Sequence, residues 1–321
     1  IATGFRNEYD IALNKDGELF SYDADMEWDV GTPWYRPTRI NHVISGAEFG
    51  WRNGTGKWPA YSPDSFGAAV NIGPGSPTGI CFGYGTGFPA KYRNSLFVAD
   101  WSYGNIHAVH LTADGSSYSG TYETFATAAP LPVTDLVVRP QDGALYFAIG
   151  GRKTQSGLYR IVYRGEKSEA DTAEQTDEQT HKLVALRKRL ESFHTGGENP
   201  KAIGPAIRNL SNDDRAIRFA ARIALEHQPV KSWQGRIAKI ESDHARALAV
   251  IALARNGASD QKSLAYEQLI RSNWDQASTE GRIALLRAYA LVAIRLGSPD
   301  GTQTSAIQSQ LAGQFPTGND N

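Results

Sequence analysis

The first half of the chain alternates short apolar runs with polar turns. Residues 9–20 (YDIALNKDGELF) and residues 134–147 (TDLVVRPQDGALYF) each hold an apolar run, a turn ending in Asp-Gly and a second apolar run. Asp-Gly between apolar runs predicts a β-hairpin, because glycine readily adopts the positive φ angle that the turn requires. A looser copy at 78–100 has a longer, glycine-rich turn.

Further apolar runs at 105–111 and 157–163 follow these hairpins and predict additional strands. Hairpins repeated along a chain are typical of β-propeller blades. We recognise about three blades, whereas a closed propeller normally needs at least about four. Three blades would leave two open sheet edges, and open edges favour aggregation. We therefore expect the chain to start inside a larger propeller, whose missing blades lie N-terminal in the parent protein or come from another chain.

The second half changes to helical periodicity. The segment 213–226 places apolar side chains on one stripe of a helix, namely Ile217, Ala220, Ala221, Ala224 and Leu225. Residues 211–213 (SND) supply helix-capping side chains, and Pro229 ends this helix. We expect further helices at 244–255, 261–271 and 280–296. Helices of this length and spacing predict antiparallel pairs stacked as HEAT-like repeats.

The segment 165–180 separates the two halves. It contains no large apolar side chain, so it cannot bury enough surface to offset the entropy lost on ordering. We interpret it as an acidic, solvated linker. The predicted organisation is a partial propeller at 1–164, this linker, HEAT-like α-helical repeats at 181–316 and a tail at 317–321.

The composition excludes several classes of function. The chain has 321 residues with a formal net charge of -1, so it lacks the basic surplus that nucleic-acid binding needs. No apolar run approaches the roughly 20 residues of a membrane span. Cys81 is the only cysteine, which excludes an intrachain disulfide and a covalent c-type haem in this chain. Residues 1–4 lack the basic start and the apolar core of a signal peptide.

The densest acidic loop, with the sequence DADMEWD, follows the second strand of the first hairpin. Asp23, Asp25 and Asp29 offer the hard oxygen ligands that Ca²⁺ prefers, although the spacing of an EF-hand is absent. The alternative is an acidic loop neutralised by Arg36 and Arg39, because neighbouring carboxylates repel each other unless something offsets their charge.

Three other side chains near this loop are candidates for chemistry. Arg6 and Asn7 precede the first strand and would point toward the axial mouth of a propeller, where they could bind a carboxylate or a phosphate. The alternative is a structural pair between blades. His42 follows the loop and is the candidate general base. Aromatic residues concentrated at 28–61 would either stack on a sugar or pack a long insertion between strands.

These motifs resemble the glucose/sorbosone dehydrogenase propellers. The resemblance rests on GFRN at 4–7, DGELF at 16–20, the acidic loop and SGAEFGW at 45–51. The chain more closely resembles the planctomycete-type membrane-bound dehydrogenase domain proteins, through GTPWYRP at 31–37, NIGPGSPTG at 71–79 and QSGLYR at 155–160.

The resemblance implies a six-bladed propeller that uses pyrroloquinoline quinone (PQQ) and Ca²⁺, followed by HEAT-like repeats and often by a cytochrome c module. It assigns quinone contact to Arg6 and Asn7 and calcium contact to Asp29. This chain has Ala24 where those enzymes have a glutamine, and 132–135 lacks their paired arginines. Their catalytic histidine would precede this chain.

We therefore expect part of a PQQ- and Ca²⁺-dependent sugar or alcohol dehydrogenase-like protein, periplasmic or secreted. A base would take the hydroxyl proton while hydride moves to the quinone, and electrons would pass to a haem module outside this chain. The isolated chain would be inactive. The alternative is a non-catalytic scaffold whose propeller and helical repeats bind glycan or protein partners.

Overall fold

The computed structural model describes residues 1–165 and 177–314. The chain forms two compact units. One comprises Ile1–Ala60 and Asp64–His181, and the other comprises Tyr61–Pro63 and Lys182–Asn321. Most of the predicted linker at 165–180 and all of the predicted tail at 317–321 lie outside the described residues.

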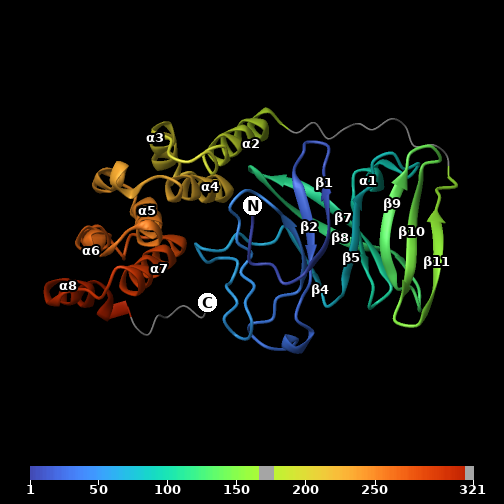
Figure 1. The fold of residues 1–321 in the computed structure, drawn as a ribbon, viewed down its shortest axis with the longest axis horizontal. Helices are drawn as coiled ribbons and strands as arrows, with labels where there is room; N and C mark the ends of the chain where they lie inside the picture. The colour runs from blue at the N-terminus through green and yellow to red at the C-terminus, as the bar shows by residue number, and fades with distance from the viewer. Residues whose placement is uncertain (166–176, 315–321) are drawn as a thin grey trace. The chain divides into compact units, whose positions relative to one another are not determined.

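The described part of the first unit contains three antiparallel sheets (Figure 1). The first has the order β1-β2-β3-β4, with β1 (Glu8–Leu13), β2 (Leu19–Asp23), β3 (Thr38–His42) and β4 (Val70–Gly73). The second has the order β5-β6-β7-β8, with β5 (Pro77–Phe82), β6 (Leu96–Asp100), β7 (Asn105–Asp114) and β8 (Ser117–Thr127). The third has the order β9-β10-β11, with β9 (Val133–Arg139), β10 (Ala144–Gly151) and β11 (Thr154–Ile161).

The three sheets fit a partial β-propeller. In each sheet the strands follow one another in chain order from one edge to the other. The first strands of the sheets are neighbours, because β5 packs against both β1 and β9. Sheets of this kind with their first strands gathered together are the blades of a propeller around its axis. The prediction of a partial propeller is thereby confirmed.

The hairpins predicted from Asp-Gly turns are present. β1 pairs with β2 around Gly17, whose φ is 74°, and β9 pairs with β10 around Gly143, whose φ is 66°. The looser copy pairs β5 with β6 and carries the short helix α1 (Ala90–Arg93) in its long turn. The sequence analysis missed β3, β4 and β8, because β3 and β8 are largely polar and β4 is only 4 residues long.

The middle sheet is buried on both faces. Leu96 and Val98 of β6 pack with Phe20 of the first sheet. Phe97, between them in the sequence, packs with Leu145 of the third sheet. Successive side chains of a strand point to opposite faces. One strand therefore contributes to both hydrophobic cores of this unit.

Apolar side chains remain exposed on the first and third sheets. On β1, Tyr9, Ile11 and Leu13 have exposed fractions of 64%, 56% and 61%. In the third sheet, Val137 and Leu158 have exposed fractions of 60% and 73%. Neighbouring exposed apolar side chains mark a surface suited to covering by other polypeptide.

The second unit is helical. Its α-helices among the described residues are α2 (Glu178–Glu191), α3 (Pro200–Asn209), α4 (Arg215–Glu226), α5 (Asp243–Asn256), α6 (Lys262–Ile270), α7 (Thr279–Arg295) and α8 (Gly301–Leu311). Short 3-10 helices are η1 (Glu27–Asp29) in the first unit and η2 (Val230–Ser232), η3 (Gln234–Lys239), η4 (Ser259–Gln261) and η5 (Ala312–Gln314) in the second. No described helix is long and apolar enough to cross a membrane.

The predicted helices correspond to α4, α5, α6 and α7. The cap of α4 differs from the prediction, because the capping side chain belongs to Asp214 and accepts a hydrogen bond from the backbone N–H of Ile217. The sequence analysis missed α2, α3 and α8. A proline at position 205 interrupts the pattern of α3, and α8 is mostly polar.

Helix α5 is central, because it packs against α4, α6 and α7 and its residues 245–254 are all buried.

The double burial of β6 yields a prediction about stability. We expect Phe97→Ala to lower the free energy of unfolding by about 3–5 kcal/mol, the usual cost of a large cavity in a core. Phe97 is 0% exposed and packs against the ring of Phe125 at 4.8 Å. The control Leu158→Ala, on an exposed side chain, should change it by only about 0.5 kcal/mol. Urea denaturation measures both variants, and equal effects would contradict the assignment of the core.

Candidate functional site

A cavity of about 890 Å³ opens in the first unit where the starts of β1, β5 and β9 come together. Because these are the first strands of the three sheets, the cavity lies at the axial mouth, and we call it the mouth cavity. The loop after β2, the turn after β6 and the turn after β10 complete its wall. Its charged and aromatic lining side chains are Arg6, Tyr9, Asp25, Glu27, Trp101, Tyr103 and Arg152.

Asp23 anchors the start of β1 at this cavity. Its carboxylate is 0% exposed and accepts hydrogen bonds from the backbone N–H groups of Arg6 at 3.0 Å and Asn7 at 2.9 Å. The guanidinium group of Arg39, also buried, donates to the same carboxylate at 2.9 Å. Charge-assisted hydrogen bonds of this kind are among the strongest in proteins. Asp23 therefore ties together three segments of the first sheet.

Asp100 makes the equivalent contacts in the second sheet. It ends β6, and its carboxylate accepts hydrogen bonds from the backbone N–H groups of Ser76 at 2.8 Å and Ser102 at 3.0 Å. The strands that end at Asp23 and Asp100 share the pattern Leu-Phe-x-x-Asp, as LFSYD and LFVAD. The pattern marks a carboxylate that fastens the start of the first strand to the end of the second. Asp23 holds the start of β1 to the end of β2 through these contacts.

Arg6 and Asn7 both line the mouth cavity. The guanidinium group of Arg6 lies 3.5 Å from the carboxylate of Glu27, and its side chain is 25% exposed. Asn7 is exposed. Both backbone N–H groups are held by Asp23, so the two side chains extend from a fixed segment of chain.

The other two predicted calcium ligands have protein partners of their own. Asp25 is buried, lines the cavity and accepts a hydrogen bond from the hydroxyl of Tyr35 at 2.7 Å. Burial raises the pKa of Asp25. Asp29 lies outside the cavity lining, where Lys57 Nζ at 2.6 Å lowers the pKa of its carboxyl group. Across 1–165 and 177–314, no group of three or more His, Cys, Asp or Glu side chains is placed to hold a metal ion.

His42 lies at the far end of the first sheet from the cavity. β3 pairs with β2 in antiparallel register. Arg39, near the start of β3, lies opposite Asp23, and His42, at the end of β3, lies opposite Phe20. The side chain of His42 is buried, with Nε2 at 2.8 Å from the carboxylate of Glu18 and Nδ1 at 2.9 Å from the hydroxyl of Ser117. The structure does not bring His42 together with the predicted cofactor-binding residues.

About half of this chain is similar to parts of sugar dehydrogenases of known structure. One is an oxidoreductase assigned as a glucose dehydrogenase from Thermus thermophilus. The match covers 50% of this chain and 46% of that protein, with 21% sequence identity and a TM-score of 0.40. The match to the PQQ-bound aldose sugar dehydrogenase from Streptomyces coelicolor covers 49% of this chain and 44% of that protein, with 13% sequence identity and a TM-score of 0.35. The match to the apo form of the soluble aldose sugar dehydrogenase from Escherichia coli covers 46% of this chain and 42% of that protein, with 18% sequence identity and a TM-score of 0.32.

This chain spans less than half the length of each of these three proteins. No protein-family model and no curated protein matches it.

The sequence analysis missed Trp101 and Arg152. Trp101 directly follows the second Leu-Phe-x-x-Asp pattern, which is the signal that could have revealed it. The guanidinium group of Arg152 lies 5.5 Å from the centroid of the Trp101 ring, close enough for a cation–π contact. Arg152 and Lys153 have φ angles of 42° and 68°. These two residues form the turn between the paired residues Gly151 and Thr154, and a two-residue hairpin turn of type I′ requires positive φ at both positions. The aromatic residues at 28–61 do not line the cavity.

Glu8, which lies in sequence between the cavity residues Asn7 and Tyr9, is a further titratable group that the sequence analysis missed. It begins β1, directly after Asn7, and its Oε1 atom is buried with no hydrogen-bond partner in the described part of the chain. Burial raises the pKa of Glu8 to about 7, and the negative charge of Asp23 adds to this effect. The carboxyl group therefore exchanges its proton close to neutral pH.

The raised pKa of Glu8 predicts a pH dependence of stability. The folded protein holds this proton more tightly than the unfolded chain, so the stability contribution is complete below pH 4.5 and declines as the pH rises to about 7. We expect Glu8→Gln to raise the free energy of unfolding at pH 8, relative to the native protein, by about 1–2 kcal/mol after allowance for solvent screening.

Unfolding measured at pH 5 and pH 8 tests this prediction. Glu198→Gln, the same change on an exposed side chain of the other unit, is the control and should change the free energy of unfolding by no more than about 0.5 kcal/mol at either pH. A profile of Glu8→Gln that runs parallel to that of the native protein would contradict the prediction.

The contacts of Asp23 predict that it is indispensable for stability. We expect Asp23→Asn to lower the free energy of unfolding by about 3–5 kcal/mol, because Arg39 would remain buried without its counter-charge. Asp142→Asn, which breaks an exposed pair with Arg139, is the matched control and should cost at most about 1 kcal/mol. Chemical denaturation compares the two, and similar costs would show that Asp23 is not an anchor.

Proposed function

We propose that this chain is part of a PQQ-dependent sugar or alcohol dehydrogenase-like protein, with the mouth cavity as the site for quinone and substrate. The observation that supports this proposal is that Arg6, Asn7, Arg152 and Trp101 line one cavity. Two guanidinium groups suit the carboxylates of a planar quinone, and an indole ring suits stacking against it. The sequence resemblance to the glucose/sorbosone dehydrogenases points to the same chemistry.

Some residues of the mouth cavity would bind the quinone, and another would take the proton of the substrate. PQQ, when bound, supplies the acceptor for a hydride from the substrate carbon. Arg6 and Arg152 would bind its carboxylates, and Asn7 would orient it through its amide. Asp25 lines the same cavity with a raised pKa, so it is better placed than His42 to take the proton of the substrate hydroxyl.

The described residues fit calcium less well than quinone. Ca²⁺ takes about six to eight oxygen ligands, whereas Asp23 and Asp29 are engaged by Arg39 and Lys57. We therefore assign no step to Ca²⁺ in this chain.

We further propose that additional blades outside this chain close the propeller on the six-bladed plan of the resembled family. The exposed side chains of Tyr9, Ile11 and Leu13 on one side, and of Val137 and Leu158 on the other, are the faces such blades would cover. The same resemblance supports HEAT-like repeats for the helices, electron transfer to a haem module outside this chain, and a periplasmic or secreted location.

A second candidate function is a non-catalytic scaffold that binds a glycan or a protein at the mouth cavity. The observation that favours it is that the three aspartates predicted to bind calcium have protein partners instead.

Isothermal titration calorimetry with PQQ, with and without Ca²⁺, tests the dehydrogenase proposal. We expect saturable binding to the native chain and binding at least about tenfold weaker in Arg6→Ala, because hydrogen bonds to charged groups contribute roughly 1.5–3 kcal/mol. Arg164→Ala, on an exposed side chain outside the cavity lining, is the matched control and should bind as the native chain does.

The outcome separates the two candidate functions. No saturable binding by a chain with a native circular dichroism spectrum would contradict a quinone site in this chain and favour the scaffold. Turnover of an aldose by the isolated chain with added PQQ would contradict the expected inactivity of the chain alone.

A further inference from the structure

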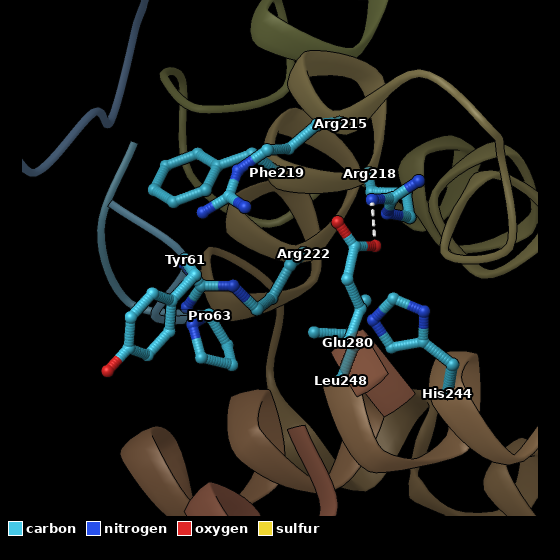
Figure 2. A pocket seen from close by; sticks show the side chains of 9 residues that line it. All are labelled: Tyr61, Pro63, Arg215, Arg218, Phe219, Arg222, His244, Leu248 and Glu280. Atoms are coloured by element: carbon cyan, nitrogen blue, oxygen red, sulfur yellow. Dashed lines mark hydrogen bonds and ion pairs between the residues drawn. The ribbon is translucent and has the colours of Figure 1, made fainter. Parts of the chain in front are cut away.

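A second cavity, of about 40 Å³, lies in the helical unit. Figure 2 shows that its wall is rich in basic side chains. Helix α4 contributes Arg215, Arg218 and Arg222, α5 contributes His244 and α7 contributes Glu280. We call this cavity the arginine pocket. Its volume exceeds that of one water site and admits a group of only a few atoms.

The three arginines lie on one face of α4, because their spacing is three and four residues. Such a stripe of arginines on a surface helix normally faces solvent. Here Arg222 is 1% exposed, and its guanidinium group lies 4.7 Å from the centroid of the Phe219 ring. The stripe therefore lines a cavity, where the charges interact more strongly than in water.

The lining of the arginine pocket is predominantly basic. It carries three guanidinium groups and one carboxylate, that of Glu280, which lies 2.8 Å from Arg218. Glu226, outside the lining, lies 2.5 Å from Arg222 and 3.1 Å from Arg255, so its charge is shared between two cations. An anion that enters the pocket therefore meets more positive than negative groups on its wall.

Burial lowers the pKa values of two titratable side chains in the arginine pocket, Arg215 and His244. Arg215 donates a hydrogen bond to the backbone carbonyl of Ser62 at 3.1 Å. Burial lowers the pKa of Arg215, and Arg218 adds to that effect against the attraction of Glu280. Burial also lowers the pKa of His244, which favours the neutral imidazole. The positive charge of the wall therefore belongs to its arginines.

Three helices present their N-terminal turns to the same pocket. Arg215 is the first residue of α4, His244 the second of α5 and Glu280 the second of α7. Aligned peptide dipoles make each helix N-terminus partly positive, so these turns add to the charge of the arginines. Beyond its N-cap Asp214, α4 has no acidic residue in its first turn. A cation at this end of a helix is unfavourable for folding, which is consistent with a function in binding an anion.

We propose that the arginine pocket binds an oxyanion, a phosphate or carboxylate group carried by a small molecule. Guanidinium forks match the paired oxygen atoms of both groups. The size of the cavity limits the bound part to this head group. Glu280 competes with the oxyanion for Arg218, so it limits the affinity of the site.

Isothermal titration calorimetry of the full chain with inorganic phosphate and with acetate, at constant ionic strength, tests the proposal. We expect saturable binding of one or both probes. Arg215→Gln should weaken it by about tenfold, because one charge-assisted hydrogen bond is lost. Glu280→Gln should tighten binding several-fold, because it removes the competing carboxylate and leaves the three arginines in place. Arg236→Gln, the same change on an exposed side chain of η3, is the matched control.

The opposite responses of Arg215→Gln and Glu280→Gln distinguish a binding site from a structural cluster. Binding of acetate alone would identify a carboxylate ligand, and stronger binding of phosphate would identify a phosphate ligand. Absence of saturable binding by both probes would overturn the proposal. So would equal affinities in Arg215→Gln and Arg236→Gln, or weaker binding in a folded Glu280→Gln variant. These results do not depend on whether PQQ binds to the mouth cavity.

Discussion

The buried carboxylate of Asp23 is the contact on which the mouth of the first unit depends. Removing a carboxylate from water is costly, and the cost is offset only when several donors surround it. Here the donors are Arg39 and the two backbone N–H groups that precede β1. One buried charge therefore joins three segments and places Arg6 at the cavity. Asp100 repeats the arrangement in the next sheet, so the wall of the cavity is built from a repeated structural unit.

The same anchors create the chemical character of the mouth cavity. Asp23 holds the segment from which Arg6 and Asn7 extend, and its negative charge contributes to the raised pKa of Glu8. Asp25, two residues further along, is buried at the cavity wall. The arginines of the mouth cavity therefore share its wall with a buried carboxyl group, that of Asp25, whose pKa is raised by burial.

Each of the two units contains a cavity with arginines in its wall, and these arginines are held in place in different ways. In the mouth cavity, Arg152 is exposed, and its position depends on the tight turn between β10 and β11 and on the ring of Trp101. In the arginine pocket, Arg222 is almost fully buried and rests on Phe219. Binding at the first site is therefore expected to depend on the geometry of loops. The proposed binding at the second would depend on helices that hold their charged side chains in place.

The sequence by itself determined the elements whose signals are local. The hairpins around Gly17 and Gly143 and the helices from α4 to α7 follow from turn chemistry and periodicity within a few residues. Only the tertiary structure decided which side chains meet. It gave Asp23, Asp25 and Asp29 separate partners and took His42 to the far end of its sheet. It also brought Arg152 to the mouth cavity, although 146 positions separate it from Arg6 in the chain. These outcomes depend on contacts between distant segments and on burial, which local patterns of residues do not encode.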